Sequence, residues 1–152
     1  MKSRRAVTIQ AGAIPFRQGR GGRLEILLIR RVNKKKWGIP KGMVERGQSP
    51  PEAAEAESIE EAGASGELSP ESIGAFTYTK EGAQFLVHVY LLQVRESHEV
   101  FPEHRVRERA WFPLERAVSM IRHPEVRDMI RSLPTNLARG SKGTLTFVGD
   151  QN

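Results

Sequence analysis

Five glutamates lie within ten residues (52–61) of this 152-residue chain. Glu57 lies three residues before Glu60 and four before Glu61, so in a helix the three carboxylates share one face. Each like-charge pair at this spacing destabilises an isolated helix by about 0.2–0.5 kcal/mol, and residues 47–79 contain no Lys or Arg to offset it. A divalent cation would compensate, and all-oxygen ligation favours Mg²⁺ or Mn²⁺ over zinc.

Local signals predict the helix that carries these carboxylates. Ser49-Pro50-Pro51-Glu52 supplies an N-cap, prolines for the first turn and the glutamate of a capping box. The helix should run to residue 62 and stop at Gly63. Its inward stripe consists of the small residues Ala54, Ser58 and Ala62. Small side chains would let the helix backbone approach a sheet closely, which would fix the position of the carboxylates.

An ordinary solvated acidic face is the alternative interpretation of this helix. Glutamate is a good helix former, and the helix dipole favours acids in the first turn, which accounts for Glu52. The dipole disfavours negative charge near the C-terminal end, where Glu60 and Glu61 lie. The position of these two glutamates therefore favours metal binding.

Composition limits the classes of protein to consider. The content of 38% hydrophobic and 28% charged residues is typical of one soluble domain, and the absence of cysteine excludes disulfides and thiolate metal sites. No apolar run reaches the ~20 residues of a membrane span, and the N-terminus lacks the apolar core of a signal peptide. We therefore expect a cytoplasmic protein that does not bind membranes. The net charge of +6, despite the acidic helix, suits polyanions, with phosphate-rich small molecules favoured over nucleic acid.

The periodicity predicts a mixed α/β or α+β sandwich. Strands are expected at 5–16, 24–30, 73–78, 83–94 and 109–112, and further helical pieces at 114–121 and 124–133. We expect a single domain over residues 1–133. Residues 134–152 show little pattern, which predicts a loosely ordered C-terminal tail.

Residues 42–64 resemble the Nudix box, a pattern of glycine, glutamate, Arg-Glu, Glu-Glu and glycine at fixed spacing. The matching positions are Gly42, Glu57, Glu60, Glu61 and Gly63. The departures are Gln48 for the early glutamate, Ala56 for the arginine, and Ser58 for a bulky apolar residue. Gln10-Ala11-Gly12-Ala13, Trp37-Gly38-Ile39-Pro40-Lys41-Gly42 and Trp111-Phe112 are also similar to Nudix domains, so the resemblance covers about residues 5–132.

The resemblance implies a Nudix-type α/β/α sandwich with a mixed sheet that hydrolyses a phosphoanhydride bond. It implies that Mg²⁺ or Mn²⁺ is held by the Gly42 carbonyl with Glu57, Glu60 and Glu61, and that these three glutamates are catalytic. Nudix enzymes often place a further base before the last strand. Of the candidates Glu103, His104 and Glu108, we choose Glu108 as a fourth catalytic residue.

Basic residues near the glycine-rich turn suggest the substrate. The expected substrate-binding residues are Arg5, Arg30, Arg31, Lys36 and Lys41. Their arrangement resembles the diadenosine polyphosphate and diphosphoinositol polyphosphate phosphohydrolases, whose long phosphate chains need several cations. Two alternatives remain: a pyrophosphohydrolase acting on RNA 5′ ends or nucleoside triphosphates, and a non-catalytic nucleotide- or RNA-binding module. The oligomeric state is not predictable from the sequence.

Overall fold

A seven-stranded mixed sheet forms the centre of the molecule in the computed structural model, which describes residues 6–140 and 143–148. The strands are β1 (Val7–Gln18), β2 (Leu24–Arg31), β3 (Lys41–Met43), β4 (Ala64–Leu68), β5 (Gly74–Lys80), β6 (Ala83–Ser97) and β7 (Arg107–Pro113). The order is β4-β6-β1-β2-β7, with β3 beside β1 and β5 beside β6. β1 and β6 pair in parallel, whereas the other pairs are antiparallel. The predicted mixed sheet is confirmed, although β3 and β4 were not anticipated.

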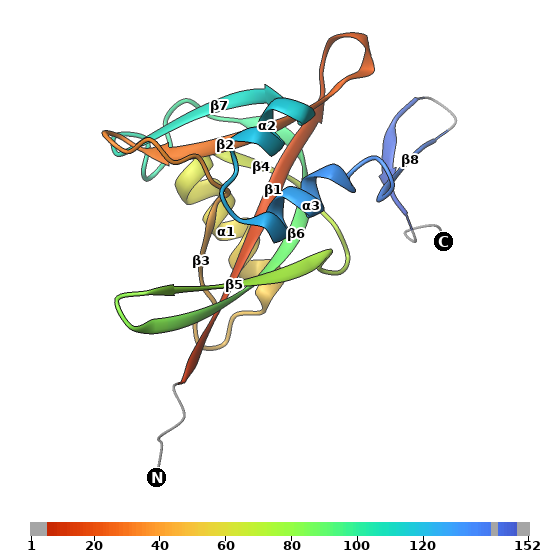
Figure 1. The fold of residues 1–152 in the computed structure, drawn as a ribbon. Helices are drawn as coiled ribbons and strands as arrows, with labels where there is room; N and C mark the ends of the chain where they lie inside the picture. Colours follow the sequence, from red (N-terminus) through yellow and green to blue (C-terminus); the bar gives the residue numbers. More distant parts are fainter. Residues whose placement is uncertain (1–5, 141–142, 149–152) are drawn as a thin grey trace.

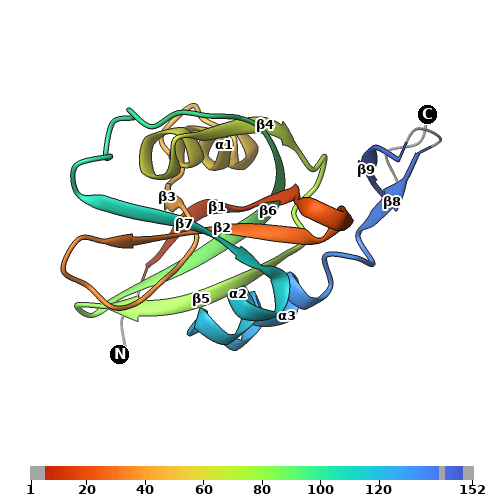
Figure 2. The same cartoon turned by 90° about the horizontal axis from the view of Figure 1, so that it is seen from above.

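Helices cover both faces of this sheet, as the view in Figure 2 shows. The helix α1 (Pro50–Ala62) lies on one face, and α2 (Leu114–Met120) and α3 (Pro124–Arg131) lie on the other. Side chains alternate between the two layers along β2: Ile26 and Leu28 belong to the core under α2 and α3, and Leu27 and Ile29 to the core under α1. This alternation with two apolar faces produces the expected α/β/α sandwich.

The connection between β6 and β7 passes over the C-terminal end of α1. The backbone N–H of His98 donates to the carbonyl of Gly63, and that of Glu103 donates to the carbonyl of Glu60. These bonds satisfy carbonyl groups that a helix end leaves without partners. They also bring Glu103 close to the acidic face of α1.

The prediction of a loosely ordered tail after residue 133 is wrong for the part of the tail that the structure describes. The strands β8 (Leu137–Arg139) and β9 (Leu145–Phe147) form a hairpin at one end of the sheet (Figure 1). Leu137, Leu145 and Phe147 are buried in the core, and the Phe147 ring meets that of Phe16 edge-on at 6.2 Å. Three separated apolar residues are too few to give a readable period. Their burial depends on the surface that the domain offers them.

The helices of the described residues are short or polar. None of them is long and apolar enough to cross a membrane.

Candidate active site

Capping and packing place the acidic helix as the sequence predicts. The Ser49 side chain accepts from the Glu52 N–H while the Glu52 carboxylate accepts from the Ser49 N–H, so the capping box is complete. The helix ends at Gly63, whose φ of 63° lies in the left-handed region. The small residues Ala54, Ser58 and Ala62 are fully buried against the sheet. Glu57 and Glu61 lie beside this stripe on the helix surface, so the packing of the stripe holds their carboxylates against β3.

Gly42 and Glu57, two of the predicted metal ligands, lie against each other. Gly42 is the middle residue of β3 and pairs with Ala11 of β1. A Cβ atom at position 42 would overlap the Glu57 carboxyl group. Only glycine at position 42 therefore allows the Glu57 carboxylate to approach the backbone of β3. The structure brings these two predicted site residues together.

Glu61 is the most buried of the five helix glutamates, with 8% of its surface exposed. Its Oε1 accepts the backbone N–H of Lys41 at 3.1 Å, and its Oε2 pairs with Nη2 of Arg107 at 2.9 Å. The Nε of Arg107 donates to Glu103 at 2.9 Å. Arg107 thus bridges an acid of α1 and an acid of the connection between β6 and β7.

Burial and mutual repulsion perturb the carboxylates. Burial, followed by the negative charges of Glu61, Glu60 and Glu103, raises the pKa of Glu57 to about 7, against the opposing effect of Arg107. Burial also raises the pKa of Glu61, although Arg107 and the Lys41 N–H oppose this shift. Excess negative charge is therefore concentrated where α1 faces β3. Glu60 itself is exposed and acts on Glu57 through its charge.

The residues present fit a divalent cation. The donor set consists of carboxylate oxygens and a backbone carbonyl, the ligands that Mg²⁺ and Mn²⁺ prefer. Burial raises the pKa of Glu57, and the neighbouring charges of Glu61, Glu60 and Glu103 raise it further. Within residues 6–140 and 143–148, no three acidic or histidine side chains stand together as a ready-made metal cluster. The Glu61 oxygens are instead engaged by Arg107 and the Lys41 N–H. Metal binding would therefore require these side chains to adjust.

Replacing Glu57 with glutamine should stabilise the metal-free protein at alkaline pH. A carboxyl group whose pKa is raised on folding lowers stability as pH increases from about 4.5 to about 7, and the full penalty applies above that. Because Glu57 is partly exposed, we expect a gain of only about 1 kcal/mol, or about 3 °C in Tm, at pH 8. Glu57→Gln should have little effect at pH 4.5. Thermal melts in EDTA at both pH values measure the difference, and an equal shift at both would contradict the assignment.

The departures from the box have mild structural consequences. The Gln48 side chain accepts the Glu45 N–H at 2.9 Å and so braces the turn before the helix. Ala56 is exposed on α1. Ser58 is fully buried and donates to the Ala54 carbonyl at 2.8 Å, so its hydroxyl is satisfied inside the helix. None of these residues leaves a buried group unpaired.

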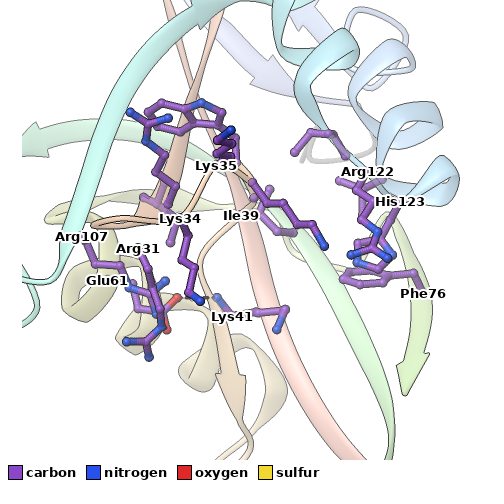
Figure 3. A pocket seen from close by; sticks show the side chains of 17 residues that line it. Arg31, Lys34, Lys35, Ile39, Lys41, Glu61, Phe76, Arg107, Arg122 and His123 are labelled. Carbon is purple, nitrogen blue, oxygen red and sulfur yellow. Dashed lines mark hydrogen bonds and ion pairs between the residues drawn. The ribbon is translucent and has the colours of Figure 1, made fainter. Parts of the chain in front are cut away.

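A cavity of about 590 Å³ opens beside this acidic site. Eight lysines and arginines and one glutamate contribute to its lining: Arg30, Arg31, Lys34, Lys35, Lys36, Lys41, Arg107, Arg122 and Glu61. Figure 3 shows Arg31, Glu61 and Arg107 gathered at one side of the cavity, and Phe76, Arg122 and His123 at the other. Lys41 lies between the two groups. The cavity is therefore strongly basic, and Glu61 is its one acidic lining residue among those that the structure describes.

Lys41 is held in a defined position within this cavity. Its Nζ donates to the hydroxyl of Tyr78 at 2.9 Å and lies 4.3 Å from the centre of the Tyr78 ring. The Tyr78 hydroxyl in turn donates to Gln10 at 2.8 Å. Most of the rotamer freedom of the lysine has already been lost, which lowers the entropic cost of binding an anion.

Of the predicted substrate-binding residues, Arg30, Arg31, Lys36 and Lys41 line the cavity, and Arg5 lies outside the described residues. The Nε atom of Arg30 is buried without a hydrogen-bond partner among the described residues.

The structure places Glu108 away from the carboxylates of α1. Along β7, Arg107 and Arg109 contact the α1 side of the sheet, so Glu108 lies on the opposite face. There it pairs with Arg30 at 3.0 Å, and 45% of its side chain is exposed. Its predicted catalytic role gains no support from this position.

Sequence reasoning missed Arg107 and favoured Glu108 over Glu103. Side chains alternate between the two faces of the sheet along β7. This alternation could have indicated that Arg107 lies on the face that α1 covers. The hydrogen bond from Glu103 to the end of α1, by contrast, depends on the path of a loop and leaves no signal in the sequence.

Comparison with known proteins identifies the family. The profile described as NUDIX domain matches residues 7–133. Two Arabidopsis thaliana relatives are Nudix hydrolase 21, chloroplastic, 34% identical over 80% of this chain, and Nudix hydrolase 16, mitochondrial, 31% identical over 79%. The chain spans 63% of the length of the first relative and 76% of the second.

Solved structures show the same fold. A C. elegans Ap4A hydrolase binary complex superposes with a TM-score of 0.73 at 24% identity, covering 85% of this chain and 96% of that one. The NUDIX domain of Shewanella oneidensis NrtR, complexed with ADP ribose, gives 0.65 at 16% identity, covering 86% and 88%. The profile match, the plant relatives and the glutamates that α1 presents to Gly42 agree: the chain belongs to the Nudix hydrolase family.

Proposed function

We propose that this protein hydrolyses a phosphoanhydride bond in a nucleoside- or inositol-linked polyphosphate, with diadenosine polyphosphates and diphosphoinositol polyphosphates as the preferred substrate classes, in a Mg²⁺-dependent reaction. The observation that carries the proposal is the cavity lining of eight cationic side chains against one glutamate. A short diphosphate offers too few anionic oxygens to engage so many cations. Such a lining therefore suits a chain of several phosphates.

The shape of the cavity agrees with an extended anion. Its volume of about 590 Å³ lies within the usual range for ligand sites of ~300–1,000 Å³. Glu61 lies at one side and Arg122 at the other, with Lys41 between them. A polyphosphate chain laid along the cavity would meet cations over its length. Its scissile bond would lie at the acidic end.

Gly42, Glu57, Glu60 and Glu61 would hold the Mg²⁺. When bound, the ion would supply charge neutralisation at the phosphate oxygens and would lower the pKa of a water molecule. Arg107 can relinquish Glu61 to the metal while keeping Glu103, because its guanidinium binds each acid through a different nitrogen. Lys41 would bind phosphate oxygens and so fix the register of the chain.

The known structures of the same fold support a phosphate-linked nucleotide as the ligand. One is an Ap4A hydrolase and another holds ADP ribose. These names describe those proteins, and they point to dinucleotide-like ligands as the first compounds to test here.

A substrate panel tests the proposal. Purified protein with Mg²⁺ should release products from diadenosine tetra- and pentaphosphate or from a diphosphoinositol polyphosphate faster than from ADP-ribose or ATP. If pyrophosphate is released from 5′-triphosphorylated RNA or from nucleoside triphosphates faster than products are released from these polyphosphates, the pyrophosphohydrolase alternative would be favoured. Binding of nucleotides or RNA without any turnover would instead indicate a non-catalytic module.

A further inference from the structure

His123 is a titratable side chain of the cavity that the proposed reaction does not use. It precedes α3 and lies on the opposite side of the cavity from Glu61 and Arg107 (Figure 3). Its ring packs on Phe76, with ring centres 4.8 Å apart, and lies 6.2 Å from the ring of Tyr78. Although it occupies the N-cap position of α3, its side chain makes no capping hydrogen bond. Its ring is thus held in place by aromatic packing.

The charges around His123 come from four parts of the chain. Lys36 belongs to the connection between β2 and β3, Lys41 to β3, Arg122 to the connection between α2 and α3, and Glu125 to the first turn of α3. β5 contributes the aromatic rings of Phe76 and Tyr78 and no charge. Burial lowers the pKa of His123, and the three cations lower it further, against the opposing effect of Glu125. At pH 7 the ring is therefore neutral in the free protein.

We propose that His123 is a substrate-binding residue that takes up a proton when a polyphosphate enters the cavity. The inference rests on the proposed function, because it assumes that the cavity binds a polyanion. A polyphosphate would neutralise Lys36, Lys41 and Arg122, the cations that disfavour a charged ring, and would offer oxygens to the imidazolium. Binding and protonation are then linked, and the bound state holds more protons than the free state.

This linkage has a definite sign. Because the complex binds more protons than the free protein, affinity must rise as pH falls. A purely structural His123, needed only to pack on Phe76, would add nothing to the pH dependence. The two roles can therefore be separated in the full-length protein without relying on turnover.

Calorimetric titration with inorganic tripolyphosphate in EDTA tests the proposal, since hydrolysis by the metal-loaded enzyme is then absent. Between pH 8 and pH 6, wild-type affinity should rise about tenfold more than that of His123→Gln. His98→Gln is the matched control, because His98 is exposed and does not line the cavity. This control should behave as wild type, and the protonation of tripolyphosphate itself is common to all three proteins.

Proton uptake can also be measured directly. Titrations at pH 7 in buffers of different ionisation enthalpy should show more protons taken up by wild type than by His123→Gln. Without any substitution, the imidazole proton resonances of His123 should move toward the charged form when tripolyphosphate is added. This NMR measurement decides the question even if the variant folds poorly.

The outcomes distinguish this inference from the function on which it rests. Equal pH dependence in wild type and His123→Gln, with no shift of the His123 resonances, would overturn the inference while leaving the hydrolase proposal intact. Failure of wild type to bind tripolyphosphate at any pH would overturn it as well. The proposed function is tested separately by the substrate panel with Mg²⁺, where an absence of turnover or a preference for RNA ends or nucleoside triphosphates would contradict it.

Discussion

Replacement of Glu61 by glutamine should lower Mg²⁺-dependent turnover about a hundredfold or more, which corresponds to about 2.7 kcal/mol of transition-state stabilisation. The glutamine keeps an oxygen that can accept the Lys41 N–H but removes the charge that a metal needs. It also leaves Arg107 with Glu103 as its remaining acidic partner. Initial rates on diadenosine tetraphosphate across a Mg²⁺ titration measure the loss.

Glu55 provides the matched control for this substitution. It lies on the same helix and is exposed, so Glu55→Gln makes the same charge change away from Gly42. Its turnover should stay within about twofold of wild type. Glu60→Gln should resemble Glu61→Gln if Glu60 turns toward a bound ion. Full activity in Glu61→Gln would show that the metal site is assigned to the wrong residues.

Lys41→Ala should impair long phosphate chains more than short ones. Charge-assisted hydrogen bonds are worth about 1.5–3 kcal/mol, enough for a differential loss of tenfold or more. Tyr78 holds the Lys41 ammonium group within the cavity, where it can meet a phosphate that a short substrate does not place there. The backbone N–H that Glu61 accepts is unchanged in the alanine variant. The ratio of kcat/KM for diadenosine pentaphosphate and ADP-ribose measures the effect.

Two lysines complete this comparison. Lys35→Ala, on the exposed connection between β2 and β3, should give a smaller differential loss than Lys41→Ala. Lys80→Ala, at the end of β5 and outside the cavity lining, should give none. Equal losses on the pentaphosphate and on ADP-ribose in Lys41→Ala would contradict the long-chain proposal and leave a general diphosphatase.

The acidic helix could be predicted almost completely because its signals are local. The capping box of Ser49 and Glu52 and the stop at Gly63 depend on backbone groups within a few residues, so sequence spacing is sufficient. The buried stripe of Ala54, Ser58 and Ala62 follows from helical periodicity alone. For the same reason the shared face of the glutamates was predictable.

Contacts between segments far apart in the chain could not be predicted from short-range sequence spacing. Arg107 meets Glu61 across 46 residues, because the pairing of β7 with β2 sets Arg31 opposite Arg107. The same register sets Glu108 opposite Arg30, on the other face of the sheet. Without this register, the sequence does not show that Glu103, and not Glu108, lies on the side of the acidic helix.

The sequence by itself determined the family and the acidic helix, and it supplied the proposed metal ligands. These follow from residue identity and short-range spacing, which folding does not alter. Only the tertiary structure decided that Glu61 meets Arg107 and that His123 faces the basic cavity. It also decided that β8 and β9 pack onto the core. Strand register and loop path bring together residues that are far apart in the chain, and many weak contacts distributed over the whole domain set that register.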